Sequence, residues 1–228
     1  MLLDDHVEAL LEKYIKNNSV VSFGTGTTNE NFLKKLGLYI ERNTLTIKVV
    51  PTSHAIAELC KNLKIKAASL DDVEVDLAFD FVDQVDEDFN YISNETTSLI
   101  RDKMIAQDTA ELIVVCEEKD FVPVLNAPIR LEVSPFAFKK TMFQVMNLGE
   151  AKQALNQKMP IISETGNFFV DVTPDEVYTV DDLDYQAKRI PGVLETSLFV
   201  GYADRAIIHG STITVKSRMT NPESGLEE

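Results

Sequence analysis

The sequence predicts an α/β protein in which a Rossmann-like parallel-sheet domain is joined to a second, smaller α+β domain of ferredoxin-like type. The first half of the chain alternates short β-rich runs with segments whose apolar residues have helical spacing, which is typical of a parallel sheet covered by helices. After Pro123 the pattern changes to two helices among strands that are joined by short turns. The length of 228 residues suits one large domain with a smaller appendage.

The first half of the chain contains the elements expected for a parallel sheet. Strands are expected at Ser19–Phe23, Leu45–Val50, Val75–Phe79 and Leu112–Cys116. Helices are expected at Asn29–Ile40, from the capping residue Ser53 through Leu63, and at Thr97–Ala106. A polar loop is expected after the third strand. We assign residues 1–126, together with C-terminal strands at about 203–218, to the Rossmann-like domain.

The second half of the chain has the elements of a small α+β domain. Strands are expected at Ile129–Val133, Pro160–Ser163, Asn167–Val172, Leu194–Val200, Arg205–Ile208 and Thr212–Lys216, and helices at Phe136–Leu148 and Asp181–Lys188. We assign residues 127–202 to this domain. The tail Met219–Glu228, which is rich in polar and turn residues, is expected to be frayed.

Charge and composition exclude several classes of partner. The formal net charge is −15, and both nucleic acids and anionic membranes require a cationic surface. No uninterrupted apolar run approaches the roughly 18 residues of a membrane span, and the acidic N-terminus does not have the pattern of a signal peptide. Cys60 and Cys116 lie in unrelated segments without a Cys/His cluster, so no metal site is expected. We therefore expect a soluble, cytoplasmic protein.

The segment Gly24–Thr28 (GTGTT) has the pattern of an anion-binding loop. It follows a predicted strand and precedes a predicted helix. Glycines let the backbone approach a ligand closely, while the N–H groups and the dipole of the helix N-terminus favour negative charge. The segment has neither the lysine of a Walker A motif nor the third glycine of the dinucleotide fingerprint. It is either a phosphate site or a tight turn with a threonine cap.

Acidic residues follow the third predicted strand. Asp80 and Asp83 lie where the strands of an open parallel sheet end, which is the edge at which such sheets bind their ligands. Paired carboxylates can orient sugar hydroxyls or transfer protons. The alternative is a solvated acidic loop, which the following Asp86, Glu87 and Asp88 would also fit. Further along the chain, a lone Arg-Asp-Lys triplet such as 101–103 is usually surface charge.

Segments in the same order along nearly the whole chain resemble the type A ribose-5-phosphate isomerase family. They are VVSFGTGTTNENFLKKL, PTSHAIAELCKNLKI, VDLAFDFVDQVDEDF, LIRDKMIAQDTAELIVV, PIRLEVSPFAFKKTMFQVMNLG, GNFFVDV and IPGVLETSLFV. They resemble the family's GTGST loop, its D-G-A-D-E region, its T-R-E-K helix, its P-V-E-V-x-P segment, and its later G-N-x-x-x-D and I-P-G-V motifs. The resemblance runs from about Ser19 to Lys216.

The resemblance implies an aldose–ketose isomerase of the non-oxidative pentose phosphate pathway. The family interconverts ribose 5-phosphate and ribulose 5-phosphate through an enediol and uses no cofactor. The residues implied for substrate binding are Thr25, Gly26, Thr27 and Thr28 for the phosphate, Phe81 and Val82 in the acidic loop, Ser93, Asn94, Glu95 and Thr96 in place of the basic glycine loop, and Lys119 near a later lysine. The residues implied for catalysis are Asp102 as the general base, with Asp80 and Asp83 orienting hydroxyls. The family is oligomeric, so a homodimer or homotetramer is expected.

Departures from the family pattern leave alternatives open. Phe81 replaces a glycine, Ser93–Thr96 replaces K-G-G-G, and Asp102 is one methylene shorter than the family's Glu. Loss of one electrostatic contact can cost about 10²–10³ in rate. The chain could therefore be a non-catalytic paralogue that senses a phosphorylated sugar, or an isomerase of another sugar phosphate.

Overall fold

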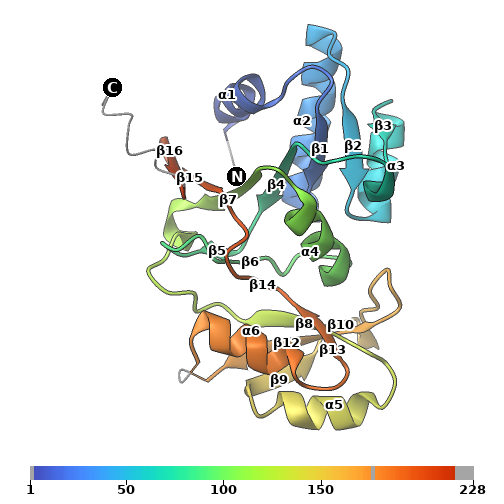
Figure 1. The fold of residues 1–228 in the computed structure, drawn as a ribbon, viewed down its shortest axis with the longest axis vertical. Helices are drawn as coiled ribbons and strands as arrows, with labels where there is room; N and C mark the ends of the chain where they lie inside the picture. Colours follow the sequence, from blue (N-terminus) through green and yellow to red (C-terminus); the bar gives the residue numbers. More distant parts are fainter. Residues whose placement is uncertain (1–2, 176–177, 219–228) are drawn as a thin grey trace.

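The structure is a computed structural model that describes residues 3–175 and 178–218. It has a large domain around a seven-stranded sheet and a small domain around a four-stranded sheet, and the two lie one above the other in Figure 1. The tail Met219–Glu228, for which fraying is expected, lies outside the described residues. None of the described helices is long and apolar enough to span a membrane.

The large sheet has the strand order β16-β15-β7-β4-β1-β2-β3, and its neighbouring strands are parallel except for β15 and β16. Its strands are β1 (Val20–Phe23), β2 (Lys48–Pro51), β3 (Lys66–Ala67), β4 (Leu77–Phe81), β7 (Leu112–Glu117), β15 (Arg205–His209) and β16 (Ile213–Ser217). After β7 the chain builds the small domain and then returns to place β15 beside β7. This arrangement is the predicted Rossmann-like class.

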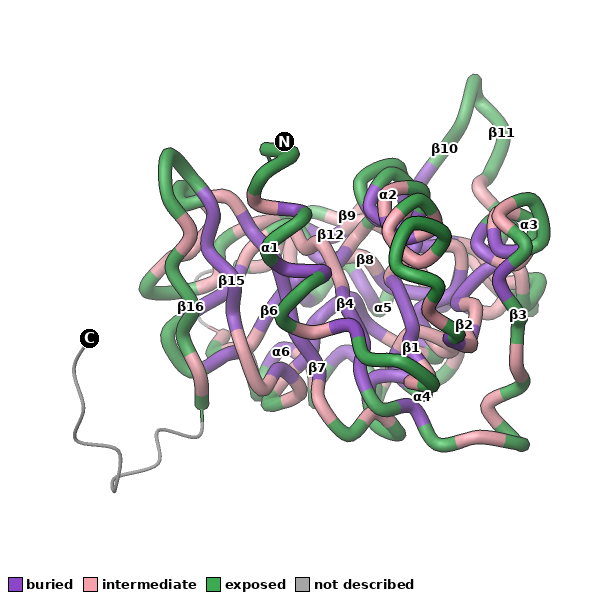
Figure 2. Tube along the Cα trace, turned by 90° about the horizontal axis from the view of Figure 1, so that it is seen from above, coloured by how far each residue is buried: buried purple, intermediate pink, exposed green. Residues whose placement is uncertain are grey.

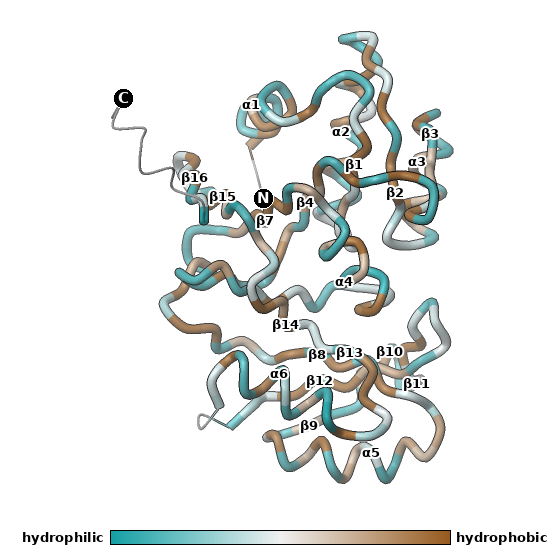
Figure 3. Tube along the Cα trace, viewed as in Figure 1, coloured by the Kyte–Doolittle hydropathy of each residue, from teal (hydrophilic) through white to brown (hydrophobic). Residues whose placement is uncertain are grey.

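Helices cover both faces of the large sheet. They are α1 (Asp4–Tyr14), α2 (Thr27–Asn43), α3 (His54–Asn62) and α4 (Leu99–Asp108), with two short 3-10 turns, η1 (Leu70–Asp72) and η2 (Glu118–Asp120). Helices α1, α2 and α3 pack with Phe23 and Phe79 on one face, and Ala106 of α4 packs with Val114 on the other. Because both faces are buried, the central strands are almost continuous apolar runs. Figures 2 and 3 show buried, hydrophobic residues along these strands.

The small domain has the ferredoxin-like order that the sequence predicts. Its elements are β8 (Ile129–Val133), α5 (Phe138–Val145), β9 (Gly149–Gln153), β12 (Phe168–Pro174), α6 (Val180–Lys188) and β13 (Val193–Thr196). The antiparallel strands have the order β13-β8-β12-β9, which is that of a β-α-β-β-α-β unit. Side chains of α5 and α6 pack against Leu131 and Val170 on one face of this sheet. Its other face is therefore directed towards the large domain, where Leu99 of α4 packs against Phe169.

Some elements differ from those predicted. The prediction of a strand at Pro160–Ser163 is wrong. The edge strand of the four-stranded sheet is β9, and Pro160 is the last residue of a short hairpin formed by β10 (Leu155–Asn156) and β11 (Met159–Pro160). Strand β9 reads GEAKQ and is half exposed, so it carries no apolar signal. The loop expected after Phe79 contains two short strands, and α1 has no counterpart among the predicted elements.

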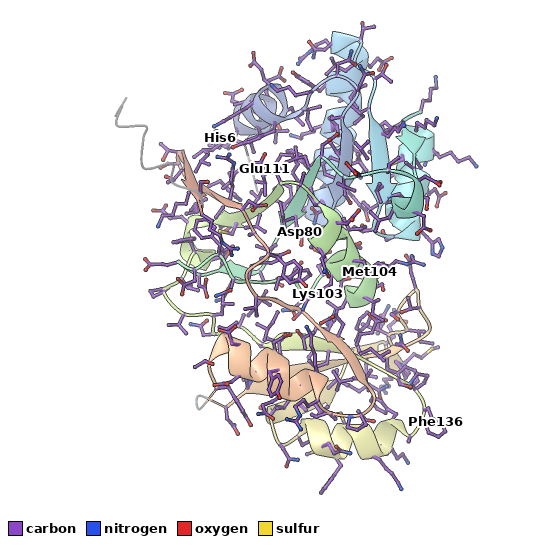
Figure 4. All side chains as sticks on the ribbon, viewed as in Figure 1. His6, Asp80, Lys103, Met104, Glu111 and Phe136 are labelled. Carbon is purple, nitrogen blue, oxygen red and sulfur yellow. The ribbon has the colours of Figure 1, made fainter. Side chains whose placement is uncertain are left out.

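A third, small sheet and a buried ion cluster join the two domains. The sheet contains β5 (Gln84–Val85), β6 (Tyr91–Ile92) and β14 (Leu198–Phe199). Beside it lies Lys103 of α4, which is 5% exposed and is labelled between the domains in Figure 4. Its Nζ lies 3.0 Å from an oxygen of Glu195 and 3.6 Å from one of Asp184 in the small domain. This cluster fixes α4 against the small domain.

We predict that Lys103→Met lowers the free energy of unfolding by about 3 kcal/mol, because it removes the buried partner of two largely buried carboxylates, Asp184 and Glu195. Lys188 contacts the same two carboxylates, at 2.9 and 3.0 Å, but its side chain is 35% exposed. Lys188→Met should therefore cost about 1 kcal/mol or less. Urea unfolding of both variants tests this difference. Equal losses would show that the burial of Lys103 has no special role.

Candidate active site

The site lies at the carboxyl ends of the central strands. Phe23 at the end of β1 pairs in register with Phe79 of β4, so the loop that follows β1 and the residue Asp80 are direct neighbours. This is the edge at which open parallel sheets bind ligands. Figure 4 shows Asp80 near the centre of the molecule, between the large sheet and α4.

The loop Gly24–Thr28 places a helix N-terminus at this edge. Gly26 is the residue before α2 and has φ of 112°, a conformation that favours glycine. A Cβ at Gly24 would lie 1.8 Å from Oδ1 of Asp80, so the glycine is required by the close approach of that carboxylate. Thr27 and Thr28 are exposed, whereas Thr25 is buried with its hydroxyl 3.1 Å from that of Thr52. Two of the three predicted hydroxyls are therefore accessible.

Asn29 of α2 holds Asp80 against the loop. Its side-chain amide donates to Oδ1 of Asp80 at 3.2 Å and to the backbone oxygen of Thr25 at 3.0 Å. Its Oδ1 accepts from the backbone N–H of Phe81 at 3.2 Å. Asn29 is 1% exposed and was not among the predicted site residues. The only signal for it is a polar residue at a position of α2 that faces the sheet.

Burial changes the acidity of Asp80. It raises the pKa of this carboxyl from 3.8 to about 7, against the lowering effect of hydrogen bonds from Ser93 and Asn29. The negative charges of Asp83 and Glu95 raise this pKa further. A group with a pKa near neutrality is present in both protonation states and can give or take a proton.

Asp102 projects from the first turn of α4, which Ser98 caps by accepting from the backbone N–H of Arg101 at 3.4 Å. Its Oδ2 accepts from the hydroxyl of Thr96, while its Oδ1 is buried without a hydrogen-bond partner among the described residues. Burial, followed by the charges of Asp80 and two glutamates, raises the Asp102 pKa well above its usual range. The triplet at 101–103 is therefore not surface charge.

The two buried carboxylates share a cavity. Asp80, Asp102 and Tyr91 are among the residues that line it, and its volume is about 20 Å³. This is enough for one water molecule. Two carboxylates beside one small cavity disfavour each other's ionisation, which is the arrangement in which one group holds a proton while the other accepts one.

The loop Ser93–Thr96 lies beside the carboxylates of the site. Ser93 is buried and lowers the pKa of Asp80. The backbone N–H of Asn94 donates to Oδ2 of Asp83 at 2.7 Å. Burial is the first cause that raises the Asp83 pKa. The resemblance assigns these residues to one site, and the structure brings them together.

The second half of this loop contacts the N-terminus of α2 and the carboxylate of Asp102. The backbone N–H of Thr27 donates to Oε1 of Glu95 at 3.1 Å. Thr96 donates its hydroxyl to Asp102, and its own oxygen accepts from the backbone N–H of Ser98 at 2.9 Å. Glu95 thus lies at the loop Gly24–Thr28, and Thr96 lies at the candidate base.

The remaining predicted residues lie at the border of the site. The ring of Phe81 packs on that of Phe32, with centroids 5.3 Å apart, and Val82 packs against the core on the other face of the sheet. The side chain of Lys119 is 73% exposed and pairs with Glu117 at 2.8 Å. None of the contacts described for Lys119 reaches the carboxylates of the site.

Charged residues of the small domain also reach the site, and they were not predicted. Nη1 of Arg130 donates to the backbone oxygen of Asn94 at 3.0 Å, and its charge lowers the pKa of Asp83. Glu132 is fully buried, accepts from the hydroxyl of Ser163 at 2.6 Å, and raises the pKa of Asp102. Both project from β8. In the described part of the chain, no group of His, Cys, Asp or Glu has an arrangement that could hold a metal ion.

Comparisons with known proteins agree with this geometry. A family model described as ribose 5-phosphate isomerase A (phosphoriboisomerase A) matches residues 48–212. The ribose-5-phosphate isomerase A of Bacillus mycoides is 31% identical over 199 residues, which cover 86% of this chain and 90% of that protein. The ribose-5-phosphate isomerase A of Pyrococcus horikoshii is 32% identical over 203 residues, covering 86% of this chain and 89% of that protein.

A solved structure has the same fold. It is a D-ribose-5-phosphate isomerase in complex with phospho-erythronic acid, which matches with a TM-score of 0.86 and 30% identity over 93% of this chain and 96% of that one. This match confirms the predicted fold class over both domains. The family model covers more than half of the chain, and the relatives match most of its length above 30% identity. The chain therefore belongs to the ribose 5-phosphate isomerase A family.

Proposed function

We propose that this protein is an aldose–ketose isomerase that interconverts ribose 5-phosphate and ribulose 5-phosphate. The observation that carries the proposal is the buried carboxylate of Asp102, which has one unpartnered oxygen and shares a cavity with Asp80. A carboxyl with a strongly raised pKa beside a second acid is typical of an acid–base site. Membership of the family supports the same reaction.

The phosphate group binds at the N-terminus of α2 in this proposal. This helix has 17 residues and begins at Thr27, directly after Gly26. The N–H groups of its first turn, one of which donates to Glu95 in the ligand-free protein, and the helix dipole together favour an anion. The small cavity lined by Asp80 and Asp102 has room for about one water molecule, so the sugar binds outside it.

Proton transfer between C1 and C2 is the central step. Asp102 removes the proton from C2 of the open-chain aldose, and the C2–H electron pair forms the C1–C2 double bond. The C1 carbonyl oxygen takes up a proton, which gives the enediol. Asp102 exchanges its proton with solvent and then gives a proton to C1 while the C2 hydroxyl loses one, which gives the ketose. Asp80, with a pKa of about 7, exchanges the oxygen-bound protons, and Asp83 orients a hydroxyl.

Negative charge develops on oxygen during this reaction and needs a cation or hydrogen-bond donors. The resemblance implied Lys119, which is paired with Glu117 in the ligand-free protein. Arg130 is also paired, through Nε and Nη2, with Asp171 at 2.7 and 3.0 Å, but it lies closer to the site, since its Nη1 donates to the backbone oxygen of Asn94. We propose that Arg130 offsets the charge, with Ser93 as a donor. A protein that only senses a sugar phosphate has no need for a carboxyl group with a strongly raised pKa, such as that of Asp102. We therefore favour the isomerase over the sensor.

The protein forms a homodimer or homotetramer and is located in the cytoplasm in this proposal. Large apolar side chains at α5 are exposed on the small domain, with Phe136 87%, Phe143 75% and Met146 58% exposed; Figure 4 labels Phe136 at its outer edge. Exposed patches of this kind mark interaction surfaces. The cysteines Cys60 and Cys116 are both free, which is usual in a reducing compartment.

We predict that Asp102→Asn lowers kcat by about 10²–10⁴, which is the usual contribution of a general base. The isosteric amide keeps the hydrogen bond from Thr96 but cannot accept the C2 proton. A coupled assay for ribulose 5-phosphate measures the rate. Asp108→Asn changes an exposed acid on the same helix and serves as the control. Equal rates for wild type and Asp102→Asn would rule out this base.

The pH dependence of kcat/KM provides a second test. The base acts when ionised, and its pKa is raised, so activity should increase with pH through an ascending limb far above the roughly pH 4 of an ordinary aspartate. Asp80→Asn removes a charge that raises the Asp102 pKa, so the limb should move to lower pH. Two results would contradict the assignment of Asp102 as the base. One is an ascending limb of kcat/KM near pH 4 in the wild type, and the other is a limb that does not move in Asp80→Asn.

Sedimentation velocity tests the proposed assembly. Phe143→Glu should convert the oligomer to monomer, because it places a charge in an apolar interface. Leu38→Glu, which changes a 66% exposed side chain of α2, should leave the assembly intact. A monomeric wild-type protein would overturn the proposal.

A further inference from the structure

The N-terminus of α2 is already occupied by a negatively charged group of the same chain. The N–H of Thr27, the first residue of α2, donates to the carboxylate of Glu95 at 3.1 Å. The same side chain lies flat against Gly26, because a Cβ there would be 2.4 Å from Cδ of Glu95. Hydrogen bonding and packing therefore agree that Glu95 covers the place where a phosphate group would bind.

The neighbours of Glu95 hold it in this position. On one side, Asn94 is fixed by its N–H bond to Asp83, by its side-chain bond to the oxygen of Pro128 at 2.9 Å, and by Arg130. On the other side, Thr96 is bonded to Asp102. A group tethered next to its binding site competes at an effective concentration in the millimolar range for short tethers. An incoming anion thus meets a local competitor.

A phosphate monoester has the properties needed to displace this carboxylate. It carries about −1.5 to −2 charge at neutral pH and three acceptor oxygens, whereas Glu95 carries one charge and uses one oxygen on Thr27. Two anions at one helix N-terminus repel each other, so both cannot remain. The side chain of Glu95 is exposed and can turn into solvent when phosphate binds.

We propose that Glu95 is an anion latch that occupies the phosphate-binding loop in the ligand-free protein and sets the affinity of that loop for phosphate. This inference rests on the proposed function of the loop as a phosphate site. If the latch is closed in about 90% of molecules, the apparent dissociation constant of phosphate is about tenfold larger than its intrinsic value.

Calorimetric titration with inorganic phosphate tests the latch without depending on catalysis. Glu95→Ala, which opens the loop, should bind phosphate about tenfold more tightly than wild type. Glu95→Gln keeps an oxygen for Thr27 but loses the charge, so its affinity should lie between the two. Glu74→Gln removes an equal charge just before β4, at the opposite edge of the sheet, and should change the dissociation constant by less than about twofold.

Two results would overturn the latch. One is a dissociation constant for phosphate that is no smaller in Glu95→Ala than in Glu74→Gln. Glu95 would then be only a helix cap, and its replacement would change the melting temperature alone. The other is the absence of phosphate binding in all variants. The isomerase assay separates this proposal from the proposed function. Tighter phosphate binding by Glu95→Ala without turnover by the wild type would support the latch and contradict the isomerase. Turnover by the wild type with unchanged phosphate binding by Glu95→Ala would support the isomerase and contradict the latch. Circular dichroism confirms that each variant is folded.

Discussion

The burial of the Asp102 carboxylate is the constraint on which the rest of the structure depends. One of its oxygens has no partner among the described residues, and its pKa is raised strongly by the loss of solvent. An isolated buried carboxylate is costly, so the surrounding structure has to hold it in place. Helix α4 is fixed for this purpose by Lys103, whose ion pairs reach into the small domain. The domain junction thus positions Asp102, the residue that we propose as the base.

The site is unusually acidic for one that we propose to receive a phosphate group. Asp80, Asp83, Asp102 and Glu95 surround it, and the chain carries a net charge of −15. In this proposal the attraction for phosphate comes from the backbone, through the first N–H groups and the dipole of α2. This source of positive potential is independent of side chains, so it persists where the basic loop of the family has become Ser93–Thr96. The same property explains why a carboxylate of the chain can occupy the loop.

The parallel sheet could be predicted from the sequence because strands buried on both faces are apolar runs. The phosphate loop and the acids after β4 could be located because their place follows from the sheet topology. Strand β9 was missed because an edge strand such as GEAKQ has no apolar pattern. Arg130 and Glu132 were missed for a related reason. In β8 (IRLEV) they alternate with apolar residues, which normally indicates a solvated face, but that face is covered by the large domain. The interaction of Glu95 with Thr27 joins residues 68 positions apart and has no local signal.

The central claim is that a carboxylate of this protein moves a proton between neighbouring carbons through an enediol. Isomerisation in D2O, followed by NMR, tests it most directly. The account predicts that ribose 5-phosphate is converted and that deuterium enters C1 of ribulose 5-phosphate and C2 of ribose 5-phosphate as the equilibrium is approached, because the base exchanges its proton with solvent. Conversion without any deuterium at these carbons would indicate transfer of hydride and would contradict the account, as would the absence of conversion.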